Sequence, residues 1–376
     1  MSTQPLHPIP FFNYPRTFQA IEEQVVAIVR DVIHRGAFIM QRDLEEFEAR
    51  LADYLGVRHA LGVANATDGL TMLWRAVGLQ PGDEILFPSH TMVASPASVV
   101  HAGGVPVPVD CGPDHLMDPD AAERAIGPRT RGIMPVQLNG RTCDMDRICA
   151  IADKRGLVII EDAAQALGSR FRDRPAGTFG RGAAFSFYPA KILGCLGDGG
   201  AVVTNDDEVA RRVRLLRDHG RNEHGDVELW GLNSRLDNLQ AAVLDFQLRG
   251  YGQVIEHRRS LARRYEDRLR TVRQVTLPPG PDEDTGHYDV YQNYEVEAER
   301  RDELRAHLSA RGIGTLIQWG GRAVHQYAAL GFTQSLPATD RLFTRCLMLP
   351  MNMTVTVDDV DRIAGEIAAF YGSALC

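Results

Sequence analysis

The sequence predicts an α/β protein: a large domain with a central, mainly parallel β-sheet flanked by helices, followed by a small C-terminal α+β domain. Three observations predict this fold. Short, mostly apolar runs alternate with helical segments through the first two thirds of the chain, as strands buried on both faces of a parallel sheet require. The 376 residues exceed one typical domain. The pattern changes beyond a long helical stretch at residues 234–272. We assign residues 1–250 to the large domain and residues 251–376, with the connecting helix, to the small one.

The first well-defined helix of the large domain covers residues 43–55, where Leu44, Phe47, Leu51 and Leu55 recur at helical spacing. Short apolar runs then predict strands, which we place at residues 84–87, 105–109, 132–136, 157–160, 183–187 and 201–204. Helical segments separate many of these strands, among them residues 70–77, 145–155 and 206–219. This alternation favours a parallel sheet with crossover helices.

The small domain is expected after a long helical stretch at residues 234–272 and a loop of proline, glycine and acidic residues at 277–286. Its predicted elements are a strand at residues 293–296, a helix at 301–312, an extended segment at 315–319 and a last helix at 357–371. These few elements predict a single α+β unit of modest size.

Charge and composition argue against several classes of function. The 41 basic and 49 acidic residues give a net charge of −8, and without basic clusters the chain is not expected to bind nucleic acid. The sequence has no run of about 20 apolar residues, so no transmembrane helix is expected. The N-terminus lacks the pattern of a secretion signal. The six cysteines include no C-x-x-C pair, so we expect free thiols in a cytoplasmic protein and no metal site.

Four segments contain chemically unusual residues, the first at the end of the strand expected at residues 157–160. There the apolar run leads directly into Glu161 and Asp162, which places carboxylates at the edge of a buried sheet, where parallel sheets bind ligands. One interpretation is a helix N-cap, for which aspartate is common. The other is a half-buried anion that holds a cationic ring nitrogen.

The second segment runs from Phe185 to Lys191 and continues through a glycine-rich stretch to Ala201. A strand ends in a proline turn, presents one lysine, and leads into a loop whose glycines permit close approach of the backbone to a ligand. A lysine that loses hydration there has a lowered pKa and a nucleophilic amine. A surface lysine beside a loop is the alternative interpretation. The glycines do not form the G-x-G-x-x-G motif of an NAD-dependent dehydrogenase.

The third and fourth segments each open a helix. In the third, Thr67 or Asp68 can cap the helix that follows, and the free amides at its start suit a phosphate group. In the fourth, Asn233 and Ser234 are good N-caps, and Arg235 is a candidate clamp for a carboxylate or phosphate. Capping alone explains the third segment equally well, and a plain surface arginine is the alternative for Arg235.

Together the four segments supply an acid for a ring nitrogen, a lysine for a Schiff base, a phosphate site and additional phosphate donors. Pyridoxal 5′-phosphate (PLP) requires these parts, because it has an aldehyde to anchor, a pyridinium to keep charged and a phosphate to hold. Each signal is modest alone, but their number and order in one chain predict PLP chemistry.

Three motifs in series resemble the DegT/DnrJ/StrS family of PLP-dependent sugar aminotransferases. The motifs are Glu161–Ser169, Ser186–Ala201 and Asn233–Asp237, and the likeness extends from about Phe38 to Leu330. The resemblance implies the PLP-dependent transferase fold type I, that of aspartate aminotransferase. It also implies transfer of an amino group from L-glutamate to a nucleotide-linked ketosugar, for glycan or natural-product biosynthesis.

Carried over by position, the resemblance implies that Lys191 forms the Schiff base with PLP and moves the proton during transamination. Asp162 is expected to keep the pyridine nitrogen protonated, and Gln165 to bond the phenolic oxygen of the cofactor. Ala66 and Thr67 are expected to offer amides to the phosphate. The other residues of the expected cofactor-binding set are Met92, Ser186, with its hydroxyl on the phosphate, Tyr188 and Asn233.

The resemblance also implies a partner and a substrate site. In the family the asparagine of the Asn-Ser-Arg motif reaches the phosphate from the neighbouring subunit, so Asn233 implies a homodimer with shared active sites. The residues expected near the substrate are Arg235, Gln318, Trp319 and His325. The segment around His325 lacks the leucine of the family's His-Leu-Gln sequence, and a purely structural histidine is the alternative there.

The chain departs from the family at several positions. Met92 stands where an aromatic residue usually stacks on the cofactor ring, and its thioether offers a smaller contact. Gln137 and Asn139 stand in a motif that is usually His-Leu-Tyr-Gly, and Gln318 and Trp319 in one that is usually His-Tyr-Pro. We expect these positions to touch substrate, and therefore expect a sugar that is unusual for the family.

The sequence after Lys191, Ile-Leu-Gly-Cys-Leu-Gly-Asp-Gly-Gly, resembles members that aminate C3 of a nucleotide-linked 3-ketosugar. The alternative is an aminotransferase for a 4-ketosugar or another ketosugar. A non-catalytic regulatory relative is less favoured, because binding alone does not require both Lys191 and Asp162. Sugar dehydratases of the family replace the lysine with histidine, so Lys191 also argues against that activity.

Overall fold

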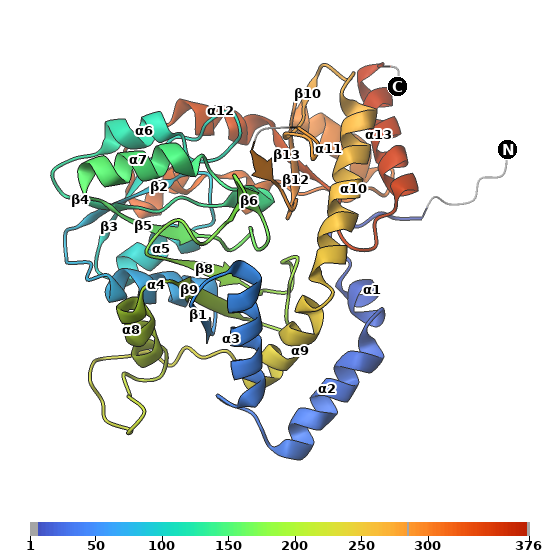
Figure 1. Cartoon of the computed structure of the whole chain (residues 1–376). Helices are drawn as coiled ribbons and strands as arrows, with labels where there is room; N and C mark the ends of the chain where they lie inside the picture. The colour runs from blue at the N-terminus through green and yellow to red at the C-terminus, as the bar shows by residue number, and fades with distance from the viewer. Residues whose placement is uncertain (1–6, 284–285, 374–376) are drawn as a thin grey trace.

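The computed structural model describes residues 7–283 and 286–373, and its central feature is a sheet of seven strands in the order β1-β9-β8-β5-β4-β2-β3 (Figure 1). The strands are β1 (His59–Val63), β2 (Glu84–Pro88), β3 (Val105–Val109), β4 (Thr130–Ile133), β5 (Val158–Asp162), β8 (Gly182–Ser186) and β9 (Gly200–Thr204). Strand β9 is antiparallel to both of its neighbours, whereas the pairs from β8 across to β3 are parallel. The sheet is therefore mainly parallel, as predicted.

The six predicted strands of the large sheet are all present, and β1 is the strand that the sequence pattern did not predict. Its five residues contain one β-branched side chain, Val63, and β-branched residues are the main local signal for a strand. Only residues 64 and 65 separate Val63 from the next helix, which begins at Ala66. Tertiary pairing with β9, rather than local preference, therefore defines this edge strand.

Helices cover both faces of the sheet (Figure 1). They are α3 (Arg42–Leu55), α4 (Ala66–Ala76), α5 (Ala94–His101), α6 (Pro119–Ala125), α7 (Met145–Arg155), α8 (Asp207–Arg217) and α9 (Asn238–Leu248). Along β2, Ile85 and Phe87 belong to a buried cluster with α4, α5 and α8, whereas Leu86 belongs to a cluster with α6 and α7. Both faces of the strand are buried, which explains its unbroken apolar run.

The helical stretch predicted at residues 234–272 forms two helices, α9 and α10 (Tyr251–Leu269). The chain before α9 is extended instead of helical, because Asp237 pairs with Ile39 in a β-bridge and has φ −59° and ψ 140°. Gly250 then separates the two helices. Helix α10 carries the chain from the large sheet to the C-terminal part (Figure 1).

The C-terminal part has its own sheet and its own hydrophobic cluster. The sheet has antiparallel strands in the order β10 (Val275–Thr276), β12 (Tyr294–Ala298) and β13 (Cys346–Leu349). Its helices are α11 (Arg301–Ser309), α12 (Pro337–Arg345) and α13 (Val357–Tyr371). Leu261 and Tyr265 of α10 pack in this cluster, and Ile9 of the N-terminal segment joins them.

Small elements complete the fold. They are α1 (Tyr14–Gln19), α2 (Glu22–Arg35), a sheet of β11 (His287–Tyr288), β6 (Arg170–Phe171) and β7 (Arg174–Pro175), and the short 3₁₀ helices η1 (Leu138–Gly140), η2 (Gln318–Gly321), η3 (Val324–Gln326) and η4 (Ala328–Leu330). The prediction of an extended segment at 315–319 is correct only in part. Leu316 pairs with Met348, but Trp319 adopts a left-handed backbone with φ 52° inside η2, so the chain turns there.

Within the described ranges, no helix is both long and apolar enough to cross a membrane. Two residues of the predicted loop, 284–285, and Cys376 lie outside the described residues. The domain boundary at residue 250 stays a prediction.

Candidate active site

A pocket of about 410 Å³ lies at the carboxyl ends of β5 and β8, between the start of α4 and the C-terminal part of the chain. Ten of the residues predicted from the sequence line it: Ala66, Thr67, Met92, Asp162, Gln165, Ser186, Tyr188, Lys191, Gln318 and Trp319. Three residues predicted for the cofactor or substrate site, Asn233, Arg235 and His325, do not line it, and neither do Gln137 and Asn139, which were expected to touch substrate. The volume is in the range of pockets that bind a cofactor or a small ligand.

Asp162 and Lys191 are the two charged groups at the centre of this pocket's chemistry. Asp162 ends β5 and is buried, where it accepts hydrogen bonds from Ser95 Oγ at 2.6 Å and from the amide of Ala164 at 3.1 Å. Burial raises the pKa of Asp162, although these donors and Lys191 oppose the shift. Burial lowers the pKa of Lys191 to about 8, although the Asp162 carboxylate opposes the shift.

The lowered pKa makes Lys191 reactive near neutral pH. About one tenth of the amine is neutral at pH 7 when the pKa is about 8, compared with roughly one part in three thousand for an ordinary lysine. Only the neutral amine attacks an aldehyde. We therefore expect the rate of PLP capture by the apoprotein to rise with pH through about 8 and to level off above about 9. Stopped-flow absorbance measures this rate, and a rise that continues tenfold per pH unit to pH 10 would contradict the lowered pKa.

Gln292 positions the loop that carries Lys191. Its amide Nε2 donates to the carbonyl of Ala190 at 2.9 Å, and its Oε1 accepts from the amide of Ile192 at 2.9 Å. The side chain thus bridges the two residues that flank Lys191 and is itself buried. Because Gln292 is about a hundred residues further along the chain, no local pattern around the lysine could have revealed it.

The start of α4 offers a site for an anionic group. The N-cap is Asn65, whose Oδ1 accepts from the amide of Asp68 at 2.8 Å. The predicted caps, Thr67 and Asp68, are therefore wrong, because the helix begins earlier, at Ala66. As the first two helical residues, Ala66 and Thr67 have no carbonyl within the helix to accept their amide hydrogens, and both line the pocket. Ser186, at the end of β8, brings a hydroxyl to the same pocket.

Gly200 lets β9 approach the start of α4 closely. A Cβ atom at this position would lie 2.7 Å from the carbonyl carbon of Asn65 and 2.8 Å from the amide nitrogen of Ala66. Both are backbone atoms, so a side chain at residue 200 would push the helix start away. Gly200 therefore allows the backbone amides at the start of α4 to keep their position beside β9.

We expect Gly200→Ala to weaken PLP binding by roughly tenfold or more, because it displaces the helix start and overpacking of this kind costs about 1–3 kcal/mol. Titration of the apoprotein with PLP, followed by absorbance, measures the change. Gly197→Ala is the matched control in the same loop, because its nearest neighbour would be the Gln240 amide at 3.6 Å, an ordinary contact. Equal affinities of the two variants would contradict this role of Gly200.

Glu161 and Gln137 turn away from the pocket, although both were expected at functional positions. The Glu161 carboxylate accepts hydrogen bonds from the amides of Gly177, Phe179 and Gly180 and from Gln137 Nε2, at 2.6–3.1 Å. It therefore fixes the turn before β8. The expectation that Gln137 touches substrate is wrong, because its amide is fully used by Glu161, Met145 Sδ and the amide of Cys143.

Three predicted site residues lie outside the pocket. Both ring nitrogens of His325 have protein partners, Ser89 Oγ at 2.7 Å and Asp340 at 3.0 Å, which supports the structural interpretation. Arg235 forms an ion pair with Asp218 at 2.9 Å. The exposed Asn233 pairs with Asp218 through the backbone and does not cap α9, which begins after Asp237. In the part of the chain that the structure describes, no cluster of His, Cys, Asp or Glu is arranged to hold a metal.

Comparison with known proteins gives a consistent result. The family model of the DegT/DnrJ/EryC1/StrS aminotransferases matches residues 19–368. The chain belongs to this family. It is 44% identical over 313 residues to a dTDP-3-amino-3,4,6-trideoxy-α-D-glucose transaminase of Streptomyces venezuelae, covering 83% of this chain and 82% of that protein. It is 36% identical to a UDP-2-acetamido-2-deoxy-3-oxo-D-glucuronate aminotransferase of Pseudomonas aeruginosa, covering 92% and 95%.

A solved structure agrees with this fold along nearly the whole chain. The crystal structure of DesV from S. venezuelae in complex with a ketimine intermediate superposes with a TM-score of 0.93, at 39% identity and with 98% and 99% of the two chains covered. The fold is therefore the PLP-dependent transferase fold type I. The cofactor of this aminotransferase family is PLP.

The pocket fits PLP on its own chemistry. One pocket contains the groups that PLP requires. They are an anion for the ring nitrogen, a lysine with a lowered pKa, and amides at a helix start together with a hydroxyl for the phosphate. The close approach at Gly200 holds those amides in place. Asn65, Ser95 and Gln292, and the pocket-lining Asn293, were not predicted from the sequence. Only Asn65 had a local signal, because asparagine three residues before Asp68 suits an N-cap.

Proposed function

We propose that this chain is a PLP-dependent aminotransferase that moves an amino group from L-glutamate to a nucleotide-linked ketosugar. The observation that carries the proposal is the convergence of Lys191, Asp162 and the α4 amides on one pocket, in a chain of the aminotransferase family. When bound, PLP supplies an electron sink that stabilises negative charge on the carbon bearing the amine.

The side chains around the pocket have distinct proposed roles. Lys191 holds the cofactor covalently and, once released, carries a proton between substrate and cofactor carbons. Asp162 keeps the proton on the ring nitrogen, and Ser95 orients its carboxylate through the 2.6 Å hydrogen bond. Gln165 accepts from the amide of Asn139 at 2.9 Å through Oε1, so its amide hydrogens are free to donate to the phenolic oxygen of the cofactor.

The phosphate and the ring faces complete the proposed cofactor site. The amides of Ala66 and Thr67 and the hydroxyl of Ser186 are proposed to bind the phosphate, where the positive end of α4 adds to the attraction. Met92 and Tyr188 line the pocket with half-exposed side chains and are proposed to pack on the ring. Gln318 and Trp319 close the pocket from the C-terminal side and are proposed to contact the sugar.

We propose the 3-keto position as the site of amination. The loop sequence after Lys191 supports this choice, and the names of the S. venezuelae and P. aeruginosa relatives refer to a 3-amino and a 3-oxo sugar. A panel of UDP-, GDP- and dTDP-linked 3- and 4-ketosugars, each supplied with glutamate, tests it by mass spectrometry of the amino sugar formed. Amination of the 4-ketosugars alone would contradict the 3-keto assignment, and amination of none of them would contradict the proposed activity.

We also propose a cytoplasmic homodimer with shared sites. Asn233 and Arg235 lie outside the pocket of their own subunit, and the resemblance places the asparagine in the partner's site. The described cysteines are free thiols, which suits a reducing compartment. Light scattering tests the dimer, and mixing the inactive variants Lys191→Ala and Asn233→Ala tests the shared site, because a mixed dimer regains one site with both residues intact. Failure to regain activity from a dimer shown to exchange subunits would contradict sharing.

A further inference from the structure

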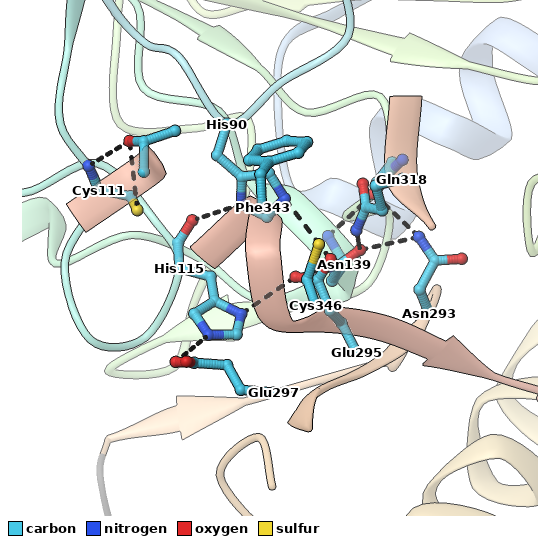
Figure 2. Close-up of polar contacts among 12 residues, drawn as sticks. His90, Cys111, His115, Asn139, Asn293, Glu295, Glu297, Gln318, Phe343 and Cys346 are labelled. Atoms are coloured by element: carbon cyan, nitrogen blue, oxygen red, sulfur yellow. Dashed lines mark hydrogen bonds and ion pairs between the residues drawn. The ribbon is translucent and has the colours of Figure 1, made fainter. Parts of the chain in front are cut away.

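Beside the pocket, the side chain of Asn139 forms hydrogen bonds with three residues from distant parts of the chain (Figure 2). Its Nδ2 donates to Glu295 Oε2 at 3.1 Å, while its Oδ1 accepts from Gln318 Nε2 at 2.6 Å and from Asn293 Nδ2 at 2.8 Å. Asn139 has a left-handed backbone, with φ 55° in η1, a conformation that asparagine tolerates better than most residues. Three of the four hydrogen-bonding positions of this amide, one donor and both acceptors, are thus used.

Glu295 anchors the group as a buried anion. It lies on β12 with 2% of its surface exposed, and it faces His90 at 3.6 Å and His115 at 3.0 Å. Burial alone would raise the pKa of Glu295, but the two imidazoles outweigh burial and hold this pKa well below its usual range. An ionised carboxylate can only accept hydrogen bonds. The group of Asn139 that faces the Glu295 carboxylate must therefore be its donor, Nδ2.

The charge of Glu295 fixes the orientation of the amides that follow. Because Asn139 must turn its Nδ2 towards the carboxylate, its Oδ1 faces the other way and requires donors. Gln318 therefore turns its Nε2 to Asn139, and its carbonyl Oε1 is left over. Gln318 is 2% exposed, it lines the pocket, and its Oε1 has no hydrogen-bond partner among the described residues. A buried polar atom without a partner costs free energy unless a ligand satisfies it.

We propose that Asn139, anchored by Glu295, is a positioning residue that makes Gln318 present its carbonyl oxygen to a hydroxyl group of the substrate sugar. The inference rests on the proposed function. It predicts a preference for sugars that carry a hydroxyl donor next to the keto carbon, because a site built to bond a hydroxyl rejects an analogue that lacks it. Asn139 itself does not line the pocket, so it acts through Gln318.

Two glutamates on β12 provide a matched pair of variants. Glu295 and Glu297 both bond His115, at 3.0 and 3.3 Å, but of the two Glu295 is the one that contacts Asn139. In Glu295→Gln the neutral amide can face Asn139 with either end, so the orientation of Gln318 is no longer fixed. Glu297→Gln leaves that orientation intact. Asn139→Gly removes the side chain while keeping a residue that adopts the left-handed backbone freely.

The readout is the ratio of kcat/KM for two sugars. The probes are the ketosugar that the wild type aminates fastest in the panel above and its analogues deoxygenated on either side of the keto carbon. We expect the wild type and Glu297→Gln to favour the hydroxyl-bearing sugar over one analogue by about tenfold or more, and Glu295→Gln and Asn139→Gly to reduce that ratio to within about threefold. Calorimetry on the pyridoxamine form should show the same loss of preference in binding.

The possible outcomes separate this inference from the function on which it rests. A wild type that binds PLP and aminates sugars without any such preference overturns the role of Gln318. An unchanged ratio in Glu295→Gln, or in Asn139→Gly if the first variant does not fold, overturns the role of Asn139. A wild type that binds no PLP or does not react with glutamate instead contradicts the proposed function.

Discussion

Lys191→Ala is expected to reduce the rate of amino transfer by about four orders of magnitude. The substitution removes both the covalent attachment of the cofactor and the group proposed to move the proton, and a positioned acid–base group alone contributes about 10²–10⁴ to a rate. Single-turnover absorbance of the PLP-loaded protein with glutamate measures the loss. Added methylamine, a small primary amine, should restore part of the rate, because the missing group is a primary amine.

The chain offers an unusually clean control for this substitution. It contains two lysines, Lys154 and Lys191. Lys154 lies on α7 with an exposed side chain that pairs with Glu123 at 3.2 Å, and it does not line the pocket. Lys154→Ala should retain the wild-type rate. A Lys191→Ala variant that keeps more than a few per cent of the rate would contradict the assignment of Lys191 as the catalytic residue.

Asp162→Asn is expected to lower the rate by about 10²–10³, the size of effect seen when one group stabilising charge in a transition state is removed. Asparagine keeps the shape of the side chain but is neutral, so the ring nitrogen loses its proton and the cofactor withdraws electrons less strongly. The visible absorption of the bound cofactor should change with it, which a folding defect alone would not cause.

The neighbouring residue supplies the control for Asp162. Glu161 has the same strand and similar burial but faces the opposite side, where it holds the turn before β8. Glu161→Gln should therefore lower the melting temperature and leave the rate per folded enzyme within about threefold. The opposite pattern, a fast Asp162→Asn and a slow Glu161→Gln, would contradict the roles given to the two carboxylates.

Much of the site could be predicted from sequence because it lies at strand ends. Asp162 and Lys191 each follow an apolar run that forms a buried strand, β5 or β8, and parallel strands bring their carboxyl ends to one edge of the sheet. The prediction of these two strands, and the order of the motifs along the chain, were therefore enough to place Asp162 and Lys191 in one pocket. The resemblance to the family then supplied the role of each.

The parts that could not be predicted depend on contacts between distant segments. Gln292 acts through partners about 100 residues away, and nothing in its own neighbourhood marks it. Asn139 was expected to touch substrate, but the role proposed for it depends on a partner about 180 residues away. Local preference also misplaced the cap of α4 and the start of α9, where Asn65 and the β-bridge of Ile39 with Asp237 decide the outcome. His325 shows the opposite case, because a motif suggested substrate contact where the fold gives both ring nitrogens protein partners.

The most direct test of the central claim is reduction of the PLP-loaded wild type with borohydride, followed by peptide mapping. We expect a yellow protein that loses its colour on reduction and carries one cofactor per chain, attached at Lys191. Because Lys154 is the other lysine of the chain, the map gives an unambiguous answer. Attachment at Lys154, or a protein that gains no visible absorbance with added PLP, would contradict the account.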